Sequence, residues 1–544
     1  MRHLVALVVV ALTLAACTGL PTSGPVGRLT DAAPTARADT RYEPAKPRRG
    51  ASAKQILAGY LDAMLAYPQA TTVVEAYMTE DAAEAWNPGP GMAVYSRLRT
   101  TVGAPIDDRA EVTLQFDQVM EVDPDGRVTV EPKTVRVPLT LVRSEGQWRV
   151  ATPLGGYLVS ERFADDYVRA FPLWFFDGDG QRLVPELSHG LVSPQLAAEM
   201  VQLLVDGPRE SSLRTYVPSA DRVRVEVRGG VADVQLDGAA PESPDRFRAQ
   251  LLSTLRGVPG IDGVRIFIDG APDGGVHPID AVVGFGPRSV ADHVYGLTED
   301  GVVAVSNGLR PIAGPWSNGG RGAAGVAVDS TSIAVVNQPR TAVAFAGRNG
   351  GGRQSISGTA FVNPSWDDQH RLWLVDRPAG TRVRVVEPGA VRTVDTPLPA
   401  GVESFAISPD GVRYVAAVNG TVLVGMVERD AGGRPTGLAA GRVVSVGLAG
   451  ERGVGWASQV RVEFVATTRY GPQLHSVGFD GADLSVPSVR DAVPNGGVAA
   501  WAGPPHDGAD RWALDESGRV WRQTAGGIWS KLTTERLRAL SVGR

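Results

Sequence analysis

The sequence predicts a multidomain protein, in which an α+β segment and a compact α/β segment precede an all-β repeat domain. The 544 residues exceed the length of about 250–300 at which a single hydrophobic core stops growing. Before residue 270, helical spacing of the apolar residues gives way to strand spacing in two separate segments. From residue 285 onward only short apolar runs remain, about 40 residues apart, between clusters of Gly, Pro, Asn and Asp.

Composition excludes several classes of protein. The chain has 54 Lys and Arg against 59 Asp and Glu, so it carries no broad basic field and no nucleic-acid partner is expected. Hydrophobic residues at 43% and charged residues at 21% exclude wholesale disorder and a polytopic membrane protein. The single Cys excludes an intramolecular disulfide and a thiolate-based zinc site.

The amino terminus has the order of a secretory signal. A short basic start precedes an apolar run from Leu4 to Leu14, which is shorter than the about 20 residues that span a bilayer. The sequence Leu-Ala-Ala-Cys that ends it resembles the bacterial lipobox. That resemblance implies that residues 1–16 are a signal peptide and that the thiol of Cys17 is acylated. An incidental Cys is the alternative, disfavoured because the one Cys of the chain stands at this position.

Residues 17–50 predict an acylated Cys followed by a flexible tether. Pro, Gly, Ser, Thr and Ala dominate, and no apolar periodicity is present. Such a chain has a root-mean-square reach of roughly 30 Å. Arg48 and Arg49 could contact anionic headgroups, although a solvated linker end is favoured.

Residues 51–185 combine helices with later strands. One helical face and a second short helix are predicted from the apolar positions Leu57, Tyr60, Leu61, Met64, Leu65, Val73, Val74 and Tyr77. From Glu111 the spacing changes to two, and residues 144–147 turn a hairpin. Helices followed by a curved antiparallel sheet resemble an NTF2-like cone. Asp107, Asp108 and Glu111 form an acidic cluster that is either a solvated loop or an ion site, with the loop favoured.

Residues 190–284 predict a compact α/β domain. Leu196, Met200, Leu203 and Leu204 stripe one helix, and a strand pair, a second helix ending at Gly257 and a last strand follow it. Five short stretches, at 204–208, 217–218, 231–234, 252–255 and 266–270, are ordered as in the GerMN domain and resemble it. That resemblance implies an envelope interaction module. We interpret Asp206, just before Gly-Pro, as a turn former and do not expect Asp233 to be catalytic.

Residues 285–544 are expected to form a β-propeller. The short apolar runs are 302–305, 333–336, 372–375, 414–418, 460–465 and 511–514. About 260 residues at a period of 40–45 give about six blades, with seven as the alternative. The turn Ser408-Pro409-Asp410-Gly411 is typical of such blades. Only residues 533–540 read as helical.

We find no convergent catalytic set in the sequence, and no cofactor is expected. None of the seven His has metal-ligand spacing, and we expect those of the mature chain to be solvated or to cap turns. Gly320 to Gly325 fits the dinucleotide pattern but lacks a βαβ context. A propeller glycosidase would need two carboxylates about 5–10 Å apart, and the candidates by default are Asp300, Asp329, Asp376, Asp410 and Glu463. The late Trp residues either line a binding face or, as we favour, pack between blades: Trp456, Trp501, Trp512, Trp521 and Trp529.

The whole order of segments resembles the LpqB family of actinobacterial lipoproteins. The start Cys17, Pro21, Thr22, Ser23, Gly24, Pro25 and Val26 fits that family as well. The resemblance implies a non-catalytic lipoprotein on the outer face of the plasma membrane. It also implies contact with the extracellular domain of a sensor histidine kinase of the MtrA–MtrB type and an influence on cell-envelope homeostasis. The alternatives are a propeller enzyme or a lectin acting on cell-wall glycan.

Replacing the single thiol tests the anchor. We expect Cys17→Ala to move the protein from the membrane fraction to the soluble fraction, because each buried CH₂ of an acyl chain contributes about 0.8 kcal/mol of membrane binding. Cell fractionation with immunodetection measures the distribution, and Thr18→Ala serves as the neighbouring control. A Cys17→Ala variant that stayed membrane-bound would contradict the lipoprotein assignment.

Overall fold

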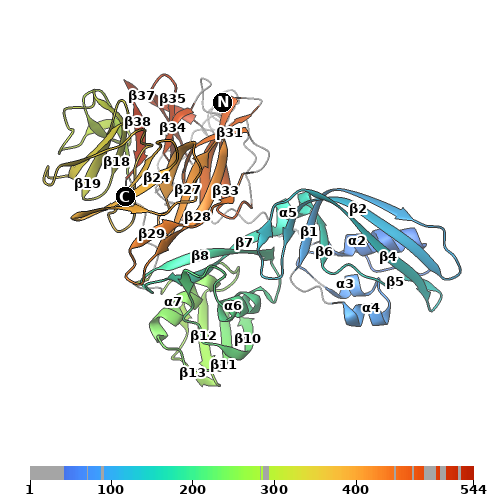
Figure 1. The fold of residues 1–544 in the computed structure, drawn as a ribbon. Helices are drawn as coiled ribbons and strands as arrows, with labels where there is room; N and C mark the ends of the chain where they lie inside the picture. The colour runs from blue at the N-terminus through green and yellow to red at the C-terminus, as the bar shows by residue number, and fades with distance from the viewer. Residues whose placement is uncertain are drawn as a thin grey trace, which may run out of the picture. The chain divides into compact units, whose positions relative to one another are not determined.

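The computed structural model describes residues 42–69, 71–86, 91–281, 284–285, 293–445, 449–468, 471–482, 498–502, 510–524 and 529–543 (Figure 1). Cys17, the signal peptide and most of the tether lie outside these ranges. So do His3, His506 and the side chain of Trp501.

The first folded segment packs helices against a sheet, as expected. Its helices are α2 (Ala53–Ala63), α3 (Thr71–Glu75), α4 (Glu80–Ala85) and α5 (Glu161–Tyr167). The sheet has the order β5-β4-β2-β1-β6, with β1 (Met92–Val102), β2 (Arg109–Val122), β4 (Lys133–Ser144), β5 (Gln147–Val150) and β6 (Tyr157–Ser160), while β3 (Val128–Thr129) pairs with β2. Ser52 and Gln55 form a capping box that fixes the start of α2. The buried side chains of Ile56 and Tyr60 then face Leu114 in one core.

A three-stranded sheet follows, and it belongs with the second segment by its core. It consists of β7 (Val168–Asp177), β8 (Leu183–Leu191) and β9 (Leu213–Arg214). Phe171, Phe175 and Val184 share a hydrophobic cluster with Leu204 and Phe247 of the α/β segment. The boundary we expected at 185 therefore falls inside β8.

The α/β segment has the predicted elements. They are α6 (Leu196–Asp206), β10 (Ala220–Arg228), β11 (Val231–Gly238), α7 (Pro244–Leu255), β12 (Gly263–Ile268), β13 (Ala271–Pro272) and β14 (His277–Pro278). The sheet order is β10-β11-β12-β13, with β11 and β12 parallel across the α7 crossover. Helix α6 ends where Gly207 takes a positive φ of 93°, a conformation that glycine adopts without a Cβ penalty.

The third segment is a β-propeller. The first three of its sheets contain β15 (Val294–Leu297), β16 (Val302–Val305), β17 (Leu309–Pro311) and β38 (Ala539–Val542); β18 (Ala323–Val328), β19 (Ser332–Asn337), β20 (Ala342–Gly347) and β21 (Gln354–Ser357); and β22 (Ser365–Trp366), β23 (Leu372–Asp376), β24 (Arg382–Glu387) and β25 (Ala390–Val394). The other three contain β26 (Val402–Ile407), β27 (Arg413–Val418), β28 (Thr421–Arg429), β29 (Pro435–Leu438) and β30 (Arg442–Val443); β31 (Ala449–Trp456), β32 (Arg461–Thr468) and β33 (Gly471–Gly478); and β34 (Val498–Ala502), β35 (Arg511–Asp515), β36 (Arg519–Gln523) and β37 (Trp529–Arg536). Each of the six predicted apolar runs falls in a different sheet.

The six sheets close into a ring. The strands β38, β18, β22, β26, β31 and β34 each contact the next in this order, and β34 contacts β38 again. Strand β38 closes the first blade by pairing with β15, from Leu297 opposite Ala539 to Val294 opposite Val542. The helix predicted over 533–540 is therefore wrong. Its Glu, Arg, Leu and Ala residues favour helices, but the ladders of β37 to β36 and of β38 to β15 outweigh that local propensity.

Aspartates shape the turns between propeller strands. Asp367 Oδ1 accepts the backbone N–H groups of Gln369 and Arg371, and its Oδ2 accepts Trp373 Nε1 at 3.1 Å. Asp515 makes the same set of bonds. Its Oδ1 accepts the backbone N–H groups of Ser517 and Arg519, and its Oδ2 accepts Trp521 Nε1 at 3.0 Å. Burial acts to raise the pKa of Asp515, but these hydrogen bonds outweigh it and lower the pKa.

Removing one of these carboxylates tests how much it contributes to the free energy of unfolding. We expect Asp515→Ala to lower the free energy of unfolding by about 2–3 kcal/mol at pH 7, because it leaves turn N–H groups and the Trp521 indole without their acceptor. Since the folded-state pKa is lowered, the loss should be full above the unfolded pKa of about 3.9 and should shrink as pH falls through the folded value. Urea unfolding at several pH values measures it. The exposed neighbour Glu516→Ala should stay within about 0.5 kcal/mol of wild type, and an equal loss in both variants would contradict the assignment.

Candidate functional site

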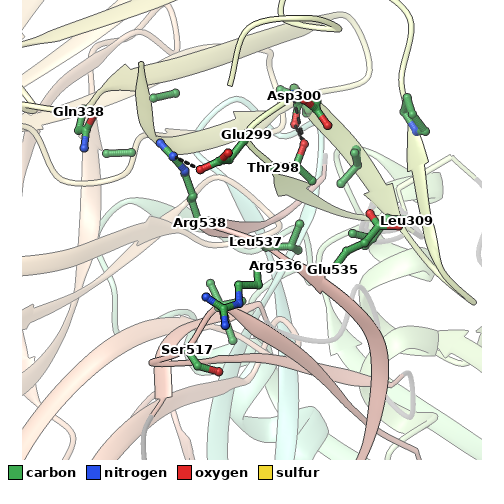
Figure 2. Close-up of a pocket in the computed structure, with 18 of the residues that line it drawn as sticks. Thr298, Glu299, Asp300, Leu309, Gln338, Ser517, Glu535, Arg536, Leu537 and Arg538 are labelled. Atoms are coloured by element: carbon green, nitrogen blue, oxygen red, sulfur yellow. Dashed lines mark hydrogen bonds and ion pairs between the residues drawn. The ribbon is translucent and has the colours of Figure 1, made fainter. Parts of the chain in front are cut away.

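A cleft of about 1020 Å³ opens on the propeller where the first and last blades meet (Figure 2). It is lined by the β15–β16 turn at Thr298 to Gly301, the β35–β36 turn at Leu514 to Gly518, and residues Glu535 to Arg538. Thr298 fixes the first turn, because its hydroxyl both donates to Gly301 O and accepts from Gly301 N. The pairing of β38 with β15 thus brings together turns from the beginning and the end of the propeller sequence.

The cleft is rich in carboxylates, but they are not arranged as an acid–base pair. Glu299 Oε1 accepts Arg538 Nη2 at 2.8 Å, and Asp515 is committed to its turn. Asp300, Glu516 and Glu535 are exposed to water. A catalytic carboxylic acid needs an environment that keeps it protonated at neutral pH, which water does not supply. The cleft therefore has a solvated rim of Asp300, Glu516 and Glu535, with the exposed Arg536 beside them.

The default glycosidase candidates lie in different blades, and four of them hold structural partners. Asp329 accepts His370 Nδ1 at 2.8 Å, and Asp376 accepts two backbone N–H groups beside Arg384. Asp410 accepts Ser408 Oγ and the N–H of Val412, and Glu463 accepts Arg511 Nε at 2.7 Å. These four carboxylates hold turns and blade contacts, as turn-forming acids do.

The other acidic candidates are also in structural contacts. Glu111 is bonded to Arg109 at 2.7 Å, which lowers the pKa of its carboxyl, and Asp108 lies 3.9 Å from Arg143. The three residues are therefore exposed at the start of β2, where Glu111 and Asp108 form ion pairs with arginines of β2 and β4. Asp233 pairs with Arg265. Asp206 ends α6, and its carboxylate accepts Gln202 Nε2. It accepts no backbone N–H of the following turn among the described bonds, so our interpretation of Asp206 as a turn former is corrected.

Two histidines differ from the sequence-based expectation, whereas three described tryptophans have the packing role that we favoured. His370 is half-exposed, but His189 and His475 are buried, so our expectation of solvated histidines was wrong for these two. Among the described residues no group of three or more His, Cys, Asp or Glu could hold a metal ion. The favoured packing role holds for the described tryptophans that are buried in the propeller: Trp456, Trp512 and Trp529.

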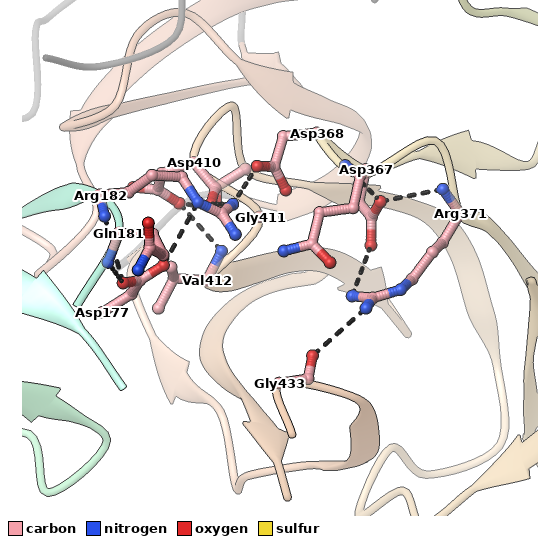
Figure 3. Close-up of polar contacts among 12 residues, drawn as sticks. Asp177, Gln181, Arg182, Asp367, Asp368, Arg371, Asp410, Gly411, Val412 and Gly433 are labelled. Atoms are coloured by element: carbon pink, nitrogen blue, oxygen red, sulfur yellow. Dashed lines mark hydrogen bonds and ion pairs between the residues drawn. The ribbon is translucent and has the colours of Figure 1, made fainter. Parts of the chain in front are cut away.

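Sequence reasoning missed a polar junction between the β7–β8 turn and the propeller (Figure 3). Arg182, beside β8, bonds the carboxylates of Asp177 and Asp368 and donates to Asp410 O at 3.2 Å. The side chains of all three charged residues are at most 11% exposed. The pattern Asp-x₃-Arg-x-Trp at 367–373 and 515–521 was a usable signal for the turns involved, whereas nothing local to Arg182 marks its partner 186 residues away.

Arg413 forms the second half of this junction. It begins β27, donates from Nη2 to Pro185 O at 2.7 Å, and stacks 4.2 Å from the centre of the Phe479 ring. Burial lowers the pKa of its guanidinium, while Asp410 and Glu186 act to raise it. In β8 itself, Glu186 accepts Arg209 Nε and the N–H of Glu210. Each of these buried charges thus has a partner of opposite sign, and the pair of Arg182 with Asp368 joins two segments.

The fold defines a multidomain protein with a β-propeller as its third segment. Three family models match in chain order: the N-terminal domain of lipoprotein LpqB at residues 46–165, the sporulation and spore germination domain at 172–274, and the LpqB β-propeller domain at 300–533. The chain belongs to the LpqB family of lipoproteins.

Curated relatives carry the same name. The chain is 27% identical to lipoprotein LpqB of Thermobifida fusca over 67% of this chain and 64% of the relative. It is 28% identical to that of Cutibacterium acnes over 48% and 46%, and 24% identical to that of Streptomyces coelicolor over 96% and 94%. The match thus spans less than two thirds of the first two relatives and nearly all of the third. These relatives are named as lipoproteins and not as enzymes.

Solved structures resemble single parts of the chain. TolB from Acinetobacter baumannii aligns over 54% of this chain and 86% of its own, with 10% identity and a TM-score of 0.35. The tandem GerMN domains of GerM from Bacillus subtilis align over 25% and 59%, with 17% identity and a TM-score of 0.18. Both likenesses are weak and neither bears on function. In the described part of the chain, no helix is both long and apolar enough to cross a bilayer.

The junction can be tested by removing its central cation. We expect Arg182→Ala to lower the free energy of unfolding by about 3–5 kcal/mol, because Asp177 and Asp368 lose the guanidinium that they share in a buried site. Chemical denaturation measures the loss. Arg97→Ala, which breaks an exposed pair with Asp117, is the matched control and should cost at most about 1 kcal/mol. Equal costs for the two variants would show that the junction contributes no more than a surface ion pair.

Proposed function

We propose that this protein is a non-catalytic, membrane-anchored lipoprotein that acts through protein contacts on the outer face of the plasma membrane. The observation that carries the non-catalytic part is the state of the candidate acids. Asp329, Asp376, Asp410 and Glu463 each hold a turn or an ion pair, and the exposed carboxylates of the propeller cleft are solvated. A catalytic pair would need one carboxyl held protonated near a second that stays ionised.

The anchor is supported by the lipobox and by the lipoprotein family. Acylation of Cys17 would hold the chain on the membrane, and the tether of residues 17–50 would give the folded part a reach of roughly 30 Å from it. A reach of that size would let the folded segments meet the extracytoplasmic domains of integral membrane proteins. When both the lipoprotein and its partner are held at the same membrane, the effective concentration of each near the other rises, which favours binding.

The partner that we propose is the extracellular domain of a sensor histidine kinase of the MtrA–MtrB type, with an effect on cell-envelope homeostasis. The family resemblance supports this choice. The folded segments supply separate solvated surfaces, and the acidic rim of the propeller cleft is one of them, with Asp300, Glu516 and Glu535 exposed. Contacts between exposed charges are weakened by added salt, because the Debye length shortens from about 8 Å at physiological ionic strength to about 3 Å at 1 M.

Capture of soluble partners by the immobilised protein tests the proposal. The mature protein, solubilised in detergent and immobilised, should retain the kinase ectodomain in solution and should fail to retain purified cell-wall glycan. Charge reversal of the cleft with Glu516→Lys and Glu535→Lys should weaken kinase retention if the cleft is the contact, whereas the exposed Glu145→Lys on the first segment is the matched control. Retention of glycan without kinase, or release of product from a glycan substrate by the purified protein, would overturn the proposal.

A further inference from the structure

Arginines from the second and third blades gather around one connection of the propeller, residues 357–361 between β21 and β22. Three of them donate to backbone oxygens of this connection: Arg340 to Phe361 O at 3.1 Å, Arg377 to Ala360 O at 3.2 Å, and Arg384 to Ser357 O at 3.1 Å. They come from the β19–β20 turn, the β23–β24 turn and β24. Nothing in the function proposed above uses them.

Arg382, at the start of β24, is the fourth arginine of this group. It lies opposite Asp376 in the register of β23 with β24 and is exposed. The described structure gives its side chain no hydrogen bond and no ion pair, so it serves no architectural contact there. The four residues form what we call the arginine cluster: Arg340, Arg377, Arg382 and Arg384.

The positive charges of the arginine cluster act on one another. Burial lowers the pKa of the Arg340 guanidinium, and the charge of Arg377 lowers it further. Burial also lowers the pKa of Arg384, Asp376 acts to raise it, and the charge of Arg382 lowers it further. A neighbouring like charge disfavours the charged form of a group. The folded protein therefore holds mutually repelling cations around this connection.

Two carboxylates lie near the arginine cluster, and they are too few to balance it. Asp376 is buried, accepts two backbone N–H groups through Oδ1, and lies 3.4 Å from Arg384 Nη2 through Oδ2. Glu403 follows the residue whose carbonyl oxygen accepts Arg377 Nη1, and it is exposed. No contact among the described residues joins Glu403 to the cluster. Four cations thus face two carboxylates, one of which is buried in its turn.

Strand β21 gives a reason to expect a protein segment at the arginine cluster. The strand lies at the edge of its sheet and ends at Ser357, the residue that Arg384 bonds. Among the described strands it pairs with β20 alone, so its outer edge presents backbone donors and acceptors. An extended peptide pairs with such an edge through its own backbone, whereas a phosphate polymer supplies acceptors only.

We propose that the arginine cluster binds an extended acidic segment of a partner protein. The four guanidinium groups come from separate positions and bond separate backbone oxygens, so they suit several carboxylates in a row better than a single ion. Arginine forks bond carboxylates with two parallel donors, which gives such a segment a preferred register. The side chain of Arg382 is fully available for this contact, because no described bond occupies it.

Calorimetry with two capped peptides tests the assignment on the mature protein in detergent. One peptide alternates Glu with Gly, and the other alternates Gln with Gly. We expect the Glu peptide to bind with a Kd below about 1 mM at low salt and the Gln peptide at least tenfold more weakly. Salt at about 1 M should abolish the binding, because the Debye length falls to about 3 Å. Equal binding of the two peptides, or no binding of the Glu peptide below about 1 mM, would overturn the proposal.

Inorganic polyphosphate of matched charge represents the competing class of ligand. Weaker binding of polyphosphate than of the Glu peptide supports a protein segment. Tighter binding would overturn that assignment in favour of a phosphate polymer.

Variants locate the binding at the arginine cluster. We expect Arg382→Glu to weaken the Glu peptide at least fivefold, while Arg382→Lys, which keeps the charge, should stay within about threefold of wild type. Arg434→Glu is the matched control, since Arg434 is an exposed arginine in the β28–β29 turn, and it should leave binding unchanged. Thermal melting checks that all three variants fold. Unchanged affinity in Arg382→Glu, or an equal loss in Arg434→Glu, would place the binding elsewhere and overturn the proposal.

Discussion

Strand β8 is buried from Leu183 to His189, and groups from all three folded segments hydrogen-bond to it. His189 N donates to Gly126 O of the first segment, and Pro185 O accepts Arg413 of the propeller. Glu186, in between, accepts Arg209 and Glu210 of the α/β segment. A backbone group or carboxylate buried without these partners would cost about 1–3 kcal/mol each. The position of the three segments around β8 is therefore tied to a small number of polar contacts.

The charges at this junction give specificity more than net stability. Arg182 with Asp177 and Asp368, and Arg413 with Asp410, are removed from water at a cost that their attraction roughly repays. Moving the propeller away from the β7–β8 turn would separate Arg182 from Asp368. Arg suits this task better than Lys, because its planar donors bond a carboxylate and a backbone carbonyl at once, as Arg182 does with Asp177 and Asp410 O.

The sequence predicts much of the fold for simple reasons. Helical and strand spacing located α6, α7 and β12, because each buries one face against a local core. The propeller was predicted by its period, since each short strand carries its own apolar run between turns. Strand β38 was missed because its pairing partner β15 lies more than 200 residues earlier, and no local signal competes with the helical propensity of 533–540. Arg182 and Arg413 were missed for the same reason: an arginine in a turn or strand reads as solvated until its distant partners are known.

The pairing of β38 with β15 also sets an order of events during synthesis. The first blade lacks its inner strand until the final strand of the ring has been made, so the place where the first and last blades meet stays uncovered until then. Contacts between such distant residues form slowly, because the loop entropy is lost before the contact repays it. An unfinished ring would expose apolar strand edges, and a chaperone that shields them would help most at that stage. A chain that stopped early in any blade could not form the ring at all.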